Sequence, residues 1–347
     1  MKNGKYSISD VAKMLGVSKA TVSRAINGNP GVGDELRKKV LDLVDEIGYR
    51  PNTIAKSLIK GHVNIIALIL GDIRNPFYAD LTFYIQQCLN KSGYMLVVLN
   101  SEYYVERELE FLDLIQQFSF AGLILLTAQD DGVENTLKAL ELPKVLVNRV
   151  LPSYNGNSVL TDNFKAGYMA VTHLFELGHT RIGFVRGPQV SSASRMRYLG
   201  YCQALGSYGL PLQEEFVFDS ELKMEAGKEV ALDFAKKAGK KPTAMIVVND
   251  LAAIGFMDGC REQNIRIPED ISVVSFDNIA FSSIKGIELT TIGQNVRMMG
   301  EQAARLILKQ IEGNDSKVEK IVLEPTLFVR SSTRQFDETN KNLLIKP

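Results

Sequence analysis

The sequence contains no tryptophan, three histidines and three cysteines among its 347 residues. Because Cys88, Cys202 and Cys260 lie far apart in the chain, we expect neither a disulfide framework nor a zinc site. The longest apolar run, residues 65–70, spans about six residues, whereas a membrane-spanning helix needs about 20. The first residues, MKNGKYSISD, lack the apolar segment of a secretory signal. These absences predict a protein of the reducing cytoplasm.

The common motifs of enzymes are also absent. The chain has no G-x-G-x-x-G, no G-x-x-x-x-G-K-[ST] and no G-x-S-x-G pattern. His62, His173 and His179 do not have the spacing of metal ligands, and His179 lies in a Gly-His-Thr-Arg turn typical of a structural residue. We therefore expect no catalytic residues, no metal and no cofactor.

The net charge of zero conceals an uneven distribution. Residues 1–62 carry eleven basic and six acidic residues, whereas residues 63–347 carry 29 basic and 34 acidic residues. A small basic head on a larger acidic body suggests that the head binds a polyanion such as nucleic acid. Chance clustering of surface charge is the alternative explanation of this asymmetry alone.

The basic head has the pattern of a helix-turn-helix. Ser7-Ile8-Ser9-Asp10 is a capping box that starts one helix, and Gly16 ends it. Ser18 is a good N-cap for a second helix over 19–26, and a third is predicted over 34–47. In such a motif the start of the second helix reaches base edges in the major groove. An ordinary three-helix bundle with a polar surface is the alternative. The candidate DNA-contacting residues here are Ser18, Lys19, Ala20, Thr21, Ser23 and Arg24.

A short segment after the third helix predicts a further, unusual helix. Pro51 is followed by good helix formers as far as Leu58. Helices of about eight residues are marginal in water, so this one is expected to form only against a partner. Residues 60–62 read as the linker to the body.

From residue 63 onward, short apolar runs alternate with helix-length amphipathic segments. This alternation is typical of an α/β protein with parallel sheets. The number of runs fits one large sheet, a TIM barrel or two sheets. Strands are expected at 64–70, 94–99, 121–126, 144–147, 181–185, 216–218, 243–248, 271–276 and 326–329. Helices are expected at 77–92, 106–118, 132–140, 164–178, 194–209, 223–238, 250–264 and 296–312.

Several ordered motifs run along essentially the whole chain. In the head they are Ile8-Ser9-Asp10-Val11-Ala12, Gly16-Val17-Ser18-Lys19-Ala20-Thr21-Val22-Ser23-Arg24 and Gly48-Tyr49-Arg50-Pro51-Asn52. In the body they are Asn75-Pro76-Phe77-Tyr78, Asp162-Asn163, Leu177-Gly178-His179-Thr180-Arg181, Asn249-Asp250, Asp277-Asn278 and Leu323-Glu324-Pro325-Thr326. Together these motifs resemble the lac/gal-type repressor family.

The resemblance implies an all-α helix-turn-helix head plus an α/β periplasmic-binding-protein-like body of two doubly wound parallel-sheet lobes. It resolves the barrel alternative, which the strand count leaves open. The implied divisions are a DNA-binding domain at 1–50, a hinge helix and linker at 51–62, an N-terminal lobe at 63–161 plus 293–324, and a C-terminal lobe at 162–292 plus 325–347.

The resemblance also implies roles for residues of the head. Lys19 and Ala20 match the family's base-reading pair, and Arg24 matches its third major-groove reader. Lysine can donate to guanine, and alanine can contact a thymine methyl group. Gly33 departs from the family pattern, which usually has a serine that caps the third helix and contacts phosphate.

Four further residues complete the implied DNA interface. Asn27 and Asn52 match positions that contact the DNA backbone, and Ala55 lies on the short helix with Leu58. Leu58 matches a wedge inserted into the minor groove, where an apolar side chain unstacks base steps and bends the duplex. Two copies of the short helix, one from each subunit, would supply each other's missing packing.

In the body, the resemblance implies an effector site in the cleft between the lobes. Asp, Asn and Arg side chains can pair with sugar hydroxyls, which both donate and accept hydrogen bonds. Capping, turn or ion-pair roles are the structural alternative for several of these positions. The implied effector-binding residues are Asp72, Asn75, Phe77, Tyr78, Asn148, Arg149, Asp162, Arg197, Leu222, Asn249, Asp277 and Gln294.

The sequence therefore predicts a homodimeric transcriptional repressor that binds a pseudo-palindromic double-stranded operator. The tail after Phe336 lacks a leucine heptad, which favours a dimer over a coiled-coil tetramer. A small molecule, most simply a sugar, is expected as the effector. A purine or a phosphoprotein co-effector is the alternative within the family. A cytoplasmic sugar-binding protein with a non-functional head is the alternative from another class.

Overall fold

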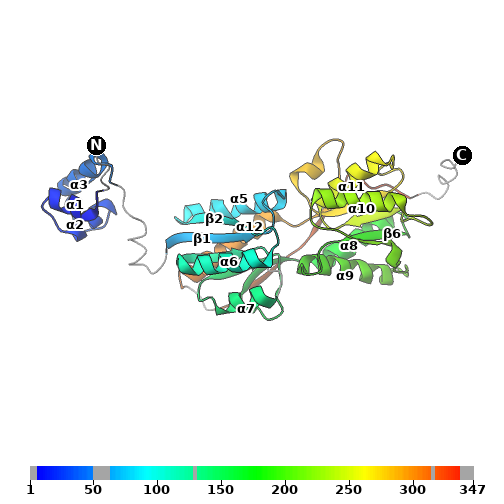
Figure 1. Ribbon diagram of the computed structural model, residues 1–347, viewed down its shortest axis with the longest axis horizontal. Coiled ribbons are helices and arrows are strands. Elements are labelled where there is room, and N and C mark those ends of the chain that lie inside the picture. The colour runs from blue at the N-terminus through cyan, green and yellow to red at the C-terminus, as the bar shows by residue number, and fades with distance from the viewer. Residues whose placement is uncertain (1–5, 50–62, 128–130, 314–316, 337–347) are drawn as a thin grey trace. The chain divides into compact units, whose positions relative to one another are not determined.

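The computed structural model describes residues 6–49, 63–127, 131–313 and 317–336. The chain divides into two compact units, Met1–Val63 and Asn64–Pro347, which we call the head and the body (Figure 1). Among the described helices, none is long and apolar enough to cross a membrane.

The head is a bundle of three helices around a small apolar core. Its helices are α1 (Ile8–Met14), α2 (Lys19–Ile26) and α3 (Asp34–Glu46). The buried residues come from the apolar stripe of each helix and are Val11, Ala12, Val22, Ala25 and Val40.

The predicted helix caps of the head are confirmed. The Ser7 side chain accepts from the backbone N–H of Asp10 and the Asp10 carboxylate accepts from Ser7, which closes the capping box at the start of α1. Gly16 follows this helix with a φ of +64°, a conformation that favours glycine. Gly33 occupies the N-cap of α3 without a side-chain hydrogen bond.

The body contains two six-stranded sheets, one in each lobe. In the N-terminal lobe the strand order is β11-β5-β4-β3-β1-β2. In the C-terminal lobe it is β12-β10-β9-β8-β6-β7, and β12 pairs antiparallel with β10. The N-terminal sheet comprises β1 (Val63–Leu70), β2 (Met95–Asn100), β3 (Phe120–Leu125), β4 (Lys144–Val147), β5 (Asn157–Thr161) and β11 (Lys320–Leu323). The C-terminal sheet comprises β6 (Ile182–Arg186), β7 (Val217–Asp219), β8 (Ala244–Val247), β9 (Ser272–Asp277), β10 (Thr290–Gly293) and β12 (Thr326–Phe328).

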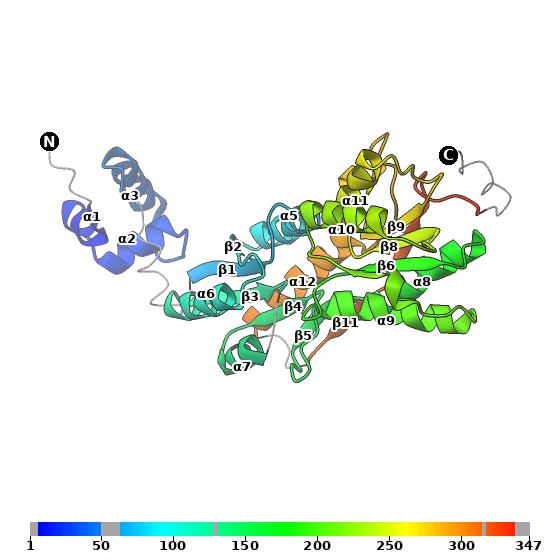
Figure 2. The same cartoon turned by 45° about the vertical axis from the view of Figure 1, so that its right-hand side comes forward.

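Each sheet is covered by a pair of helices on either face (Figures 1 and 2). The N-terminal lobe has α5 (Pro76–Lys91) and α12 (Val296–Ile311) on one face, with α6 (Val105–Gln117) and α7 (Asp131–Ala139) on the other. The C-terminal lobe has α8 (Asn163–Glu176) and α9 (Ser192–Ser207) on one face, with α10 (Met224–Lys236) and α11 (Asp250–Glu262) on the other. Short 3₁₀ turns occupy Glu214–Phe216 and Ala280–Ser283.

This arrangement confirms the predicted fold class. The chain passes between the two sheets three times, after β5, after β10 and after β11. Strands β5, β10 and β11 were not expected as strands from the sequence; each is only four or five residues long, and β5 and β10 include polar residues.

Helices α8 and α9 approach each other at two glycines. A Cβ atom on Gly167 would lie 2.0 Å from the carbonyl oxygen of Arg197, and one on Gly200 would lie 2.0 Å from that of Phe164. Glycine is therefore needed at both positions. This close packing fixes the part of α9 that carries Arg197 beside the C-terminal sheet.

Candidate functional site

The exposed face of α2 is the candidate DNA-contacting surface of the head. Val22 and Ala25 are buried, which turns Lys19, Ala20 and Arg24 to solvent. Neither Lys19 nor Arg24 forms an ion pair with any residue that the structure describes. Both cations therefore remain available for a polyanion.

Hydroxyl and amide side chains at the two ends of α2 have local partners. The Ser18 Oγ accepts from the backbone N–H of Thr21 at 3.1 Å and lies 2.8 Å from the Thr21 Oγ1, so Ser18 is the predicted N-cap. The Asn27 side-chain amide donates to the Ser23 carbonyl at 2.7 Å at the other end. Asn52, Ala55, Leu58 and the predicted helix over 51–58 lie outside the described residues.

The second candidate site is a cleft between the lobes of the body. Ten of the twelve side chains predicted to bind an effector line it: Asn75, Phe77, Tyr78, Asn148, Arg149, Arg197, Leu222, Asn249, Asp277 and Gln294. Asp277 is the last residue of β9, and the others lie on loops and helices that follow β1, β4, β6, β7, β8 and β10. In open α/β sheets this edge, beyond the carboxyl ends of the strands, is where ligands bind.

An ion pair forms the floor of the cleft on the side of the C-terminal lobe. The Arg197 guanidinium donates to the Asp277 carboxylate at 3.2 Å, and both side chains are buried. Arg197 also donates to the Asn163 side chain at 2.9 Å and to the Val248 carbonyl at 2.6 Å. The Gln294 amide donates to the same Asp277 oxygen at 2.5 Å.

Burial acts on the pKa of both charged partners. It raises the pKa of Asp277. The charge of Arg197 is the largest effect that opposes this rise, and the hydrogen bond from Gln294 is the next largest. Burial lowers the pKa of Arg197, and the Asp277 charge opposes that shift. Each group therefore opposes the effect of burial on the other, because it stabilises the ionised form of its partner.

Aromatic side chains form the opposite wall. The Phe77 and Tyr78 rings meet edge to face with centroids 5.4 Å apart at the start of α5. The Tyr103 hydroxyl donates to the Tyr78 hydroxyl at 3.3 Å. Burial raises the pKa of Tyr103 well above its usual value. A Cβ atom on Gly71 would lie 2.0 Å from the Tyr103 ring, so the absence of a side chain there makes room for it.

Two predicted effector residues do not line the cleft. The Asp72 carboxylate accepts from the Arg74 guanidinium at 2.7 and 2.9 Å, and this hydrogen bonding lowers the pKa of Asp72. The Asp162 side chain accepts from the Lys165 N–H at 2.8 Å as the N-cap of α8. Asn75 combines both roles, since it caps α5 and lines the cleft.

The cleft also contains residues that sequence reasoning missed. Ser191, Ala193 and Ser194 lie at the start of α9, which was expected to begin at residue 194 and begins at Ser192. Ser191 is its N-cap, a role that serine typically takes, so this signal was present in the sequence. Tyr103 follows β2 with a φ of +65°, and no pattern in the sequence predicts its place in the cleft.

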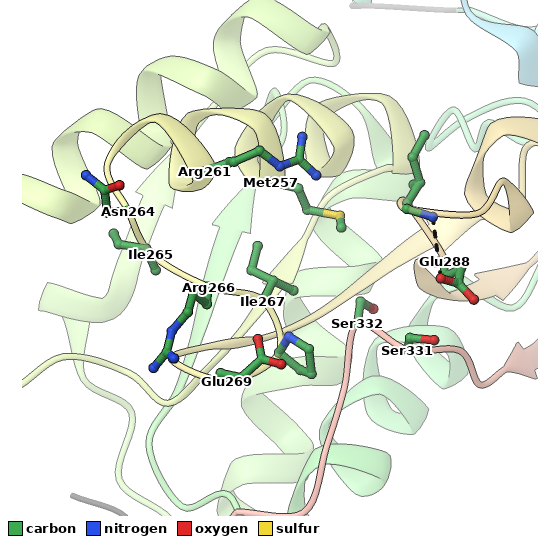
Figure 3. A pocket seen from close by; sticks show the side chains of 13 residues that line it. Met257, Arg261, Asn264, Ile265, Arg266, Ile267, Glu269, Glu288, Ser331 and Ser332 are labelled. Carbon is green, nitrogen blue, oxygen red and sulfur yellow. Dashed lines mark hydrogen bonds between the residues drawn. The ribbon is translucent and has the colours of Figure 1, made fainter. Parts of the chain in front are cut away.

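A second, roomier cavity of about 600 Å³ lies within the C-terminal lobe (Figure 3). Its lining includes Arg266, Glu288 and Ser332, and each has a protein partner. Arg266 pairs with Asp270 at 2.8 Å, Glu288 accepts from the Gly286 N–H at 3.4 Å, and Ser332 donates to the Val273 carbonyl at 2.6 Å. This cavity contains no residue predicted to bind an effector.

A helix-turn-helix head joined to a two-lobed α/β body with a polar cleft defines a ligand-responsive DNA-binding protein as a class. Residues 7–52 match the family described as "Bacterial regulatory proteins, lacI family". Residues 171–333 match the "Periplasmic binding protein-like domain". The chain is 32% identical over 337 residues to the HTH-type transcriptional regulator DegA of Bacillus subtilis (strain 168), over 95% of this chain and 98% of DegA.

Solved structures agree with this assignment. The Lac repressor dimer bound to operator and the anti-inducer ONPF is similar with a TM-score of 0.84 at 26% identity, over 95% of this chain and 100% of that one. The complex of the regulator CelR with cellobiose is similar with a TM-score of 0.71 at 28% identity, over 94% and 99% of the two chains. The chain belongs to the LacI family of DNA-binding transcriptional regulators, whose members are not enzymes.

Proposed function

We propose that this protein is a repressor whose affinity for operator DNA is controlled by a sugar-type effector bound between the lobes. The observation that carries the proposal is the cleft itself. It combines hydrogen-bonding side chains from both lobes, such as Asn148 and Asn249, with the aromatic Phe77 and Tyr78. Polar groups that pair with hydroxyls and rings that pack on apolar faces are what recognition of a small polyol requires.

The head supplies the DNA-binding half of the proposal. Lys19, Ala20 and Arg24 are exposed on one face of a helix and can reach base edges in the major groove. Ser18, Thr21, Ser23 and Asn27 would then contact the backbone. The Lac repressor, to which this chain is similar, is bound to its operator as a dimer, which supports a homodimer on a pseudo-palindromic site here. Such a regulator works in the cytoplasm, where the DNA is.

The closed state of the cleft suggests how a ligand acts. Only about 30 Å³ of free space remains in the part of the cleft that these residues line, far less than the ~300 Å³ of a small ligand pocket. A bound ligand would therefore change the positions of the two lobes relative to each other along the three connecting segments. We propose that this movement reaches the hinge at 51–62, where it changes the pairing of the two short helices on DNA. A ligand shifts this equilibrium only by its difference in affinity for the two states.

The experiment that tests the proposal uses the full chain and a random library of DNA duplexes. Repeated selection should enrich a pseudo-palindrome, which is then titrated by fluorescence anisotropy with and without sugars. We expect a sugar-dependent change in operator affinity. A library without any enriched sequence would contradict the DNA-binding half. An enriched operator whose affinity no small molecule changes would contradict the effector half and favour a phosphoprotein co-effector.

A further inference from the structure

Arg149 is a buried cation without a counter-ion in the cleft. Its side chain lines the cleft and only 5% of the residue is exposed. Its Nη1 donates to the Asn148 carbonyl at 2.8 Å, but its buried Nε has no hydrogen-bond partner. No carboxylate of the described residues lies within ion-pair distance of it. A buried charge in this state is costly unless another group neutralises it.

The remaining charges of the cleft do not neutralise Arg149. Arg197 and Asp277 are the other charged residues that line it, and they pair with each other. Arg149 acts on Asp277 only as a weaker, more distant charge that opposes the burial-induced rise in the pKa of Asp277. Asp72 is not part of the lining, and its carboxylate forms an ion pair with Arg74. The cleft therefore contains one positive charge in excess.

Helix ends add to this positive potential. Asn75, Ser191 and Asn249 are the N-caps of α5, α9 and α11, and all three line the cleft. Three long helices thus direct their N-terminal ends, the positive ends of their dipoles, toward the same space. The residue after Arg149 is held beside one of them, because the Val150 N–H donates to the Ser192 hydroxyl at 2.9 Å.

One unpartnered acceptor lies in the same cleft. The Gln294 amide is fixed by its donation to Asp277, which leaves its Oε1 buried without a hydrogen bond. A ligand must therefore accept hydrogen bonds from Arg149 and donate one to Gln294. A carboxylate or phosphate satisfies the first requirement, and a hydroxyl group on the same molecule satisfies the second.

We infer that the effector is an anionic polyhydroxy compound, a sugar derivative bearing a carboxylate or a phosphate, and that Arg149 binds its anionic group. This inference rests on the proposed function of the cleft. It adds the sign of the ligand's charge and the residue that recognises it.

The test compares the full chain with its Arg149→Gln variant in thermal-shift and calorimetric titrations. The probes are hexuronates, aldonates, sugar phosphates, their neutral parent sugars, and inorganic phosphate and acetate against chloride at equal ionic strength. The control is Arg195→Gln, which removes an exposed cation of α9 that lies outside the lining. We expect an anionic compound to bind the native chain and the control equally, and Arg149→Gln roughly ten- to a hundredfold more weakly. The carboxylate and phosphate arms then identify the source of the charge.

Three results would overturn the inference. A neutral sugar that binds the native chain and Arg149→Gln equally would overturn it and leave the proposed function intact. A complete lack of binding by every probe would count against both. The third concerns the ligand-free proteins, because loss of an uncompensated charge should leave Arg149→Gln at least as stable as the native chain. A fall in its unfolding temperature would mean that Arg149 has a structural partner.

Discussion

The guanidinium of Arg197 and the carboxylate of Asp277 form an ion pair within the C-terminal lobe, with 3.2 Å between Nη2 and Oδ1. Arg197 also donates hydrogen bonds to the Asn163 side chain and to the Val248 carbonyl. Its planar guanidinium also lies over the aromatic ring of Phe276, with the Cζ atom 4.6 Å from the centroid of that ring. Arg197 therefore holds β9 and the end of β8 in place, and it presents Asp277 to the cleft.

This relationship predicts that Arg197→Ala destabilises the body. Removing one partner of a buried ion pair leaves the other charge buried without a partner, and this typically lowers the free energy of unfolding by about 3–5 kcal/mol. At roughly 2–4 °C per kcal/mol, the unfolding temperature should fall by on the order of 10 °C. Arg195→Ala, an exposed arginine two residues earlier on α9, is the matched control and should shift it by less than about 2 °C. Equal melting of the two variants would contradict a structural role for Arg197.

A second prediction concerns Gly71 and Tyr103. Gly71→Ala should destabilise the body by about 1–3 kcal/mol, because the new methyl group would overlap the Tyr103 ring. In a Tyr103→Ala background the same substitution should cost much less, since the ring is gone. A double-mutant cycle by chemical denaturation measures this coupling. If the two effects simply add, Gly71 does not make room for the ring.

Much of the fold was predictable because it depends on local patterns. Ser18 and Gly33 take the N-cap positions expected of them, and the apolar runs at Asn64–Leu70 and Ile271–Phe276 lie in buried strands. Strand β5, with the sequence NSVLT, was missed. Its pairing with β11 joins chain segments far apart in sequence, which no local pattern reveals.

The cleft was predictable only in part, for the same reason. Asn249 and Asp277 end strands, so their place at the ligand-binding edge followed from the α/β pattern and the family resemblance. The pairing of Asp72 with Arg74 depends on side-chain geometry that spacing does not specify. Tyr103 lies in a short loop, where Glu102 and Tyr103 both adopt positive φ and direct the ring toward Tyr78. The effector-binding roles of these residues stay predictions.

A third prediction tests base reading by the head. Lys19→Ala should weaken operator binding by about 1–3 kcal/mol and relax sequence preference, because it removes a candidate donor to a base edge. Lys39→Ala is the control, since Lys39 lies on α3 and pairs with Glu35 at 2.8 Å. Titrations against the selected operator and a scrambled duplex separate the two effects. A uniform loss on both duplexes would assign Lys19 to phosphate contact instead.

A fourth prediction concerns Leu58, the expected minor-groove wedge. Leu58→Ser should weaken specific operator binding, because a polar side chain cannot replace an apolar wedge between unstacked base steps. Effector binding should remain unchanged. Anisotropy titrations and calorimetry on the same preparation give both affinities. Unchanged operator affinity would rule out the wedge role.

The last prediction follows from His179, which is buried in the C-terminal lobe. Its Nδ1 lies 2.9 Å from the Thr243 Oγ1, and its Nε2 lies 3.1 Å from the Ser272 Oγ. Burial lowers the pKa of His179 from 6.5 to about 4. Between these two values the unfolded chain binds a proton that the folded chain does not bind. The contribution of His179 to stability is therefore fully present above pH 6.5 and is lost as the pH falls toward 4.

The loss amounts to on the order of 3 kcal/mol once the pH reaches the lower pKa. Denaturation midpoints of the native chain and His179→Gln at pH 7.5, 6.0 and 5.0 measure it. The native chain should lose stability more steeply with acid than the variant, because glutamine does not titrate. His173 does not confound the comparison: burial lowers its pKa too, but both proteins retain it. Parallel pH profiles would mean that His179 takes up its proton equally in both states, and that its hydroxyl partners tolerate the imidazolium.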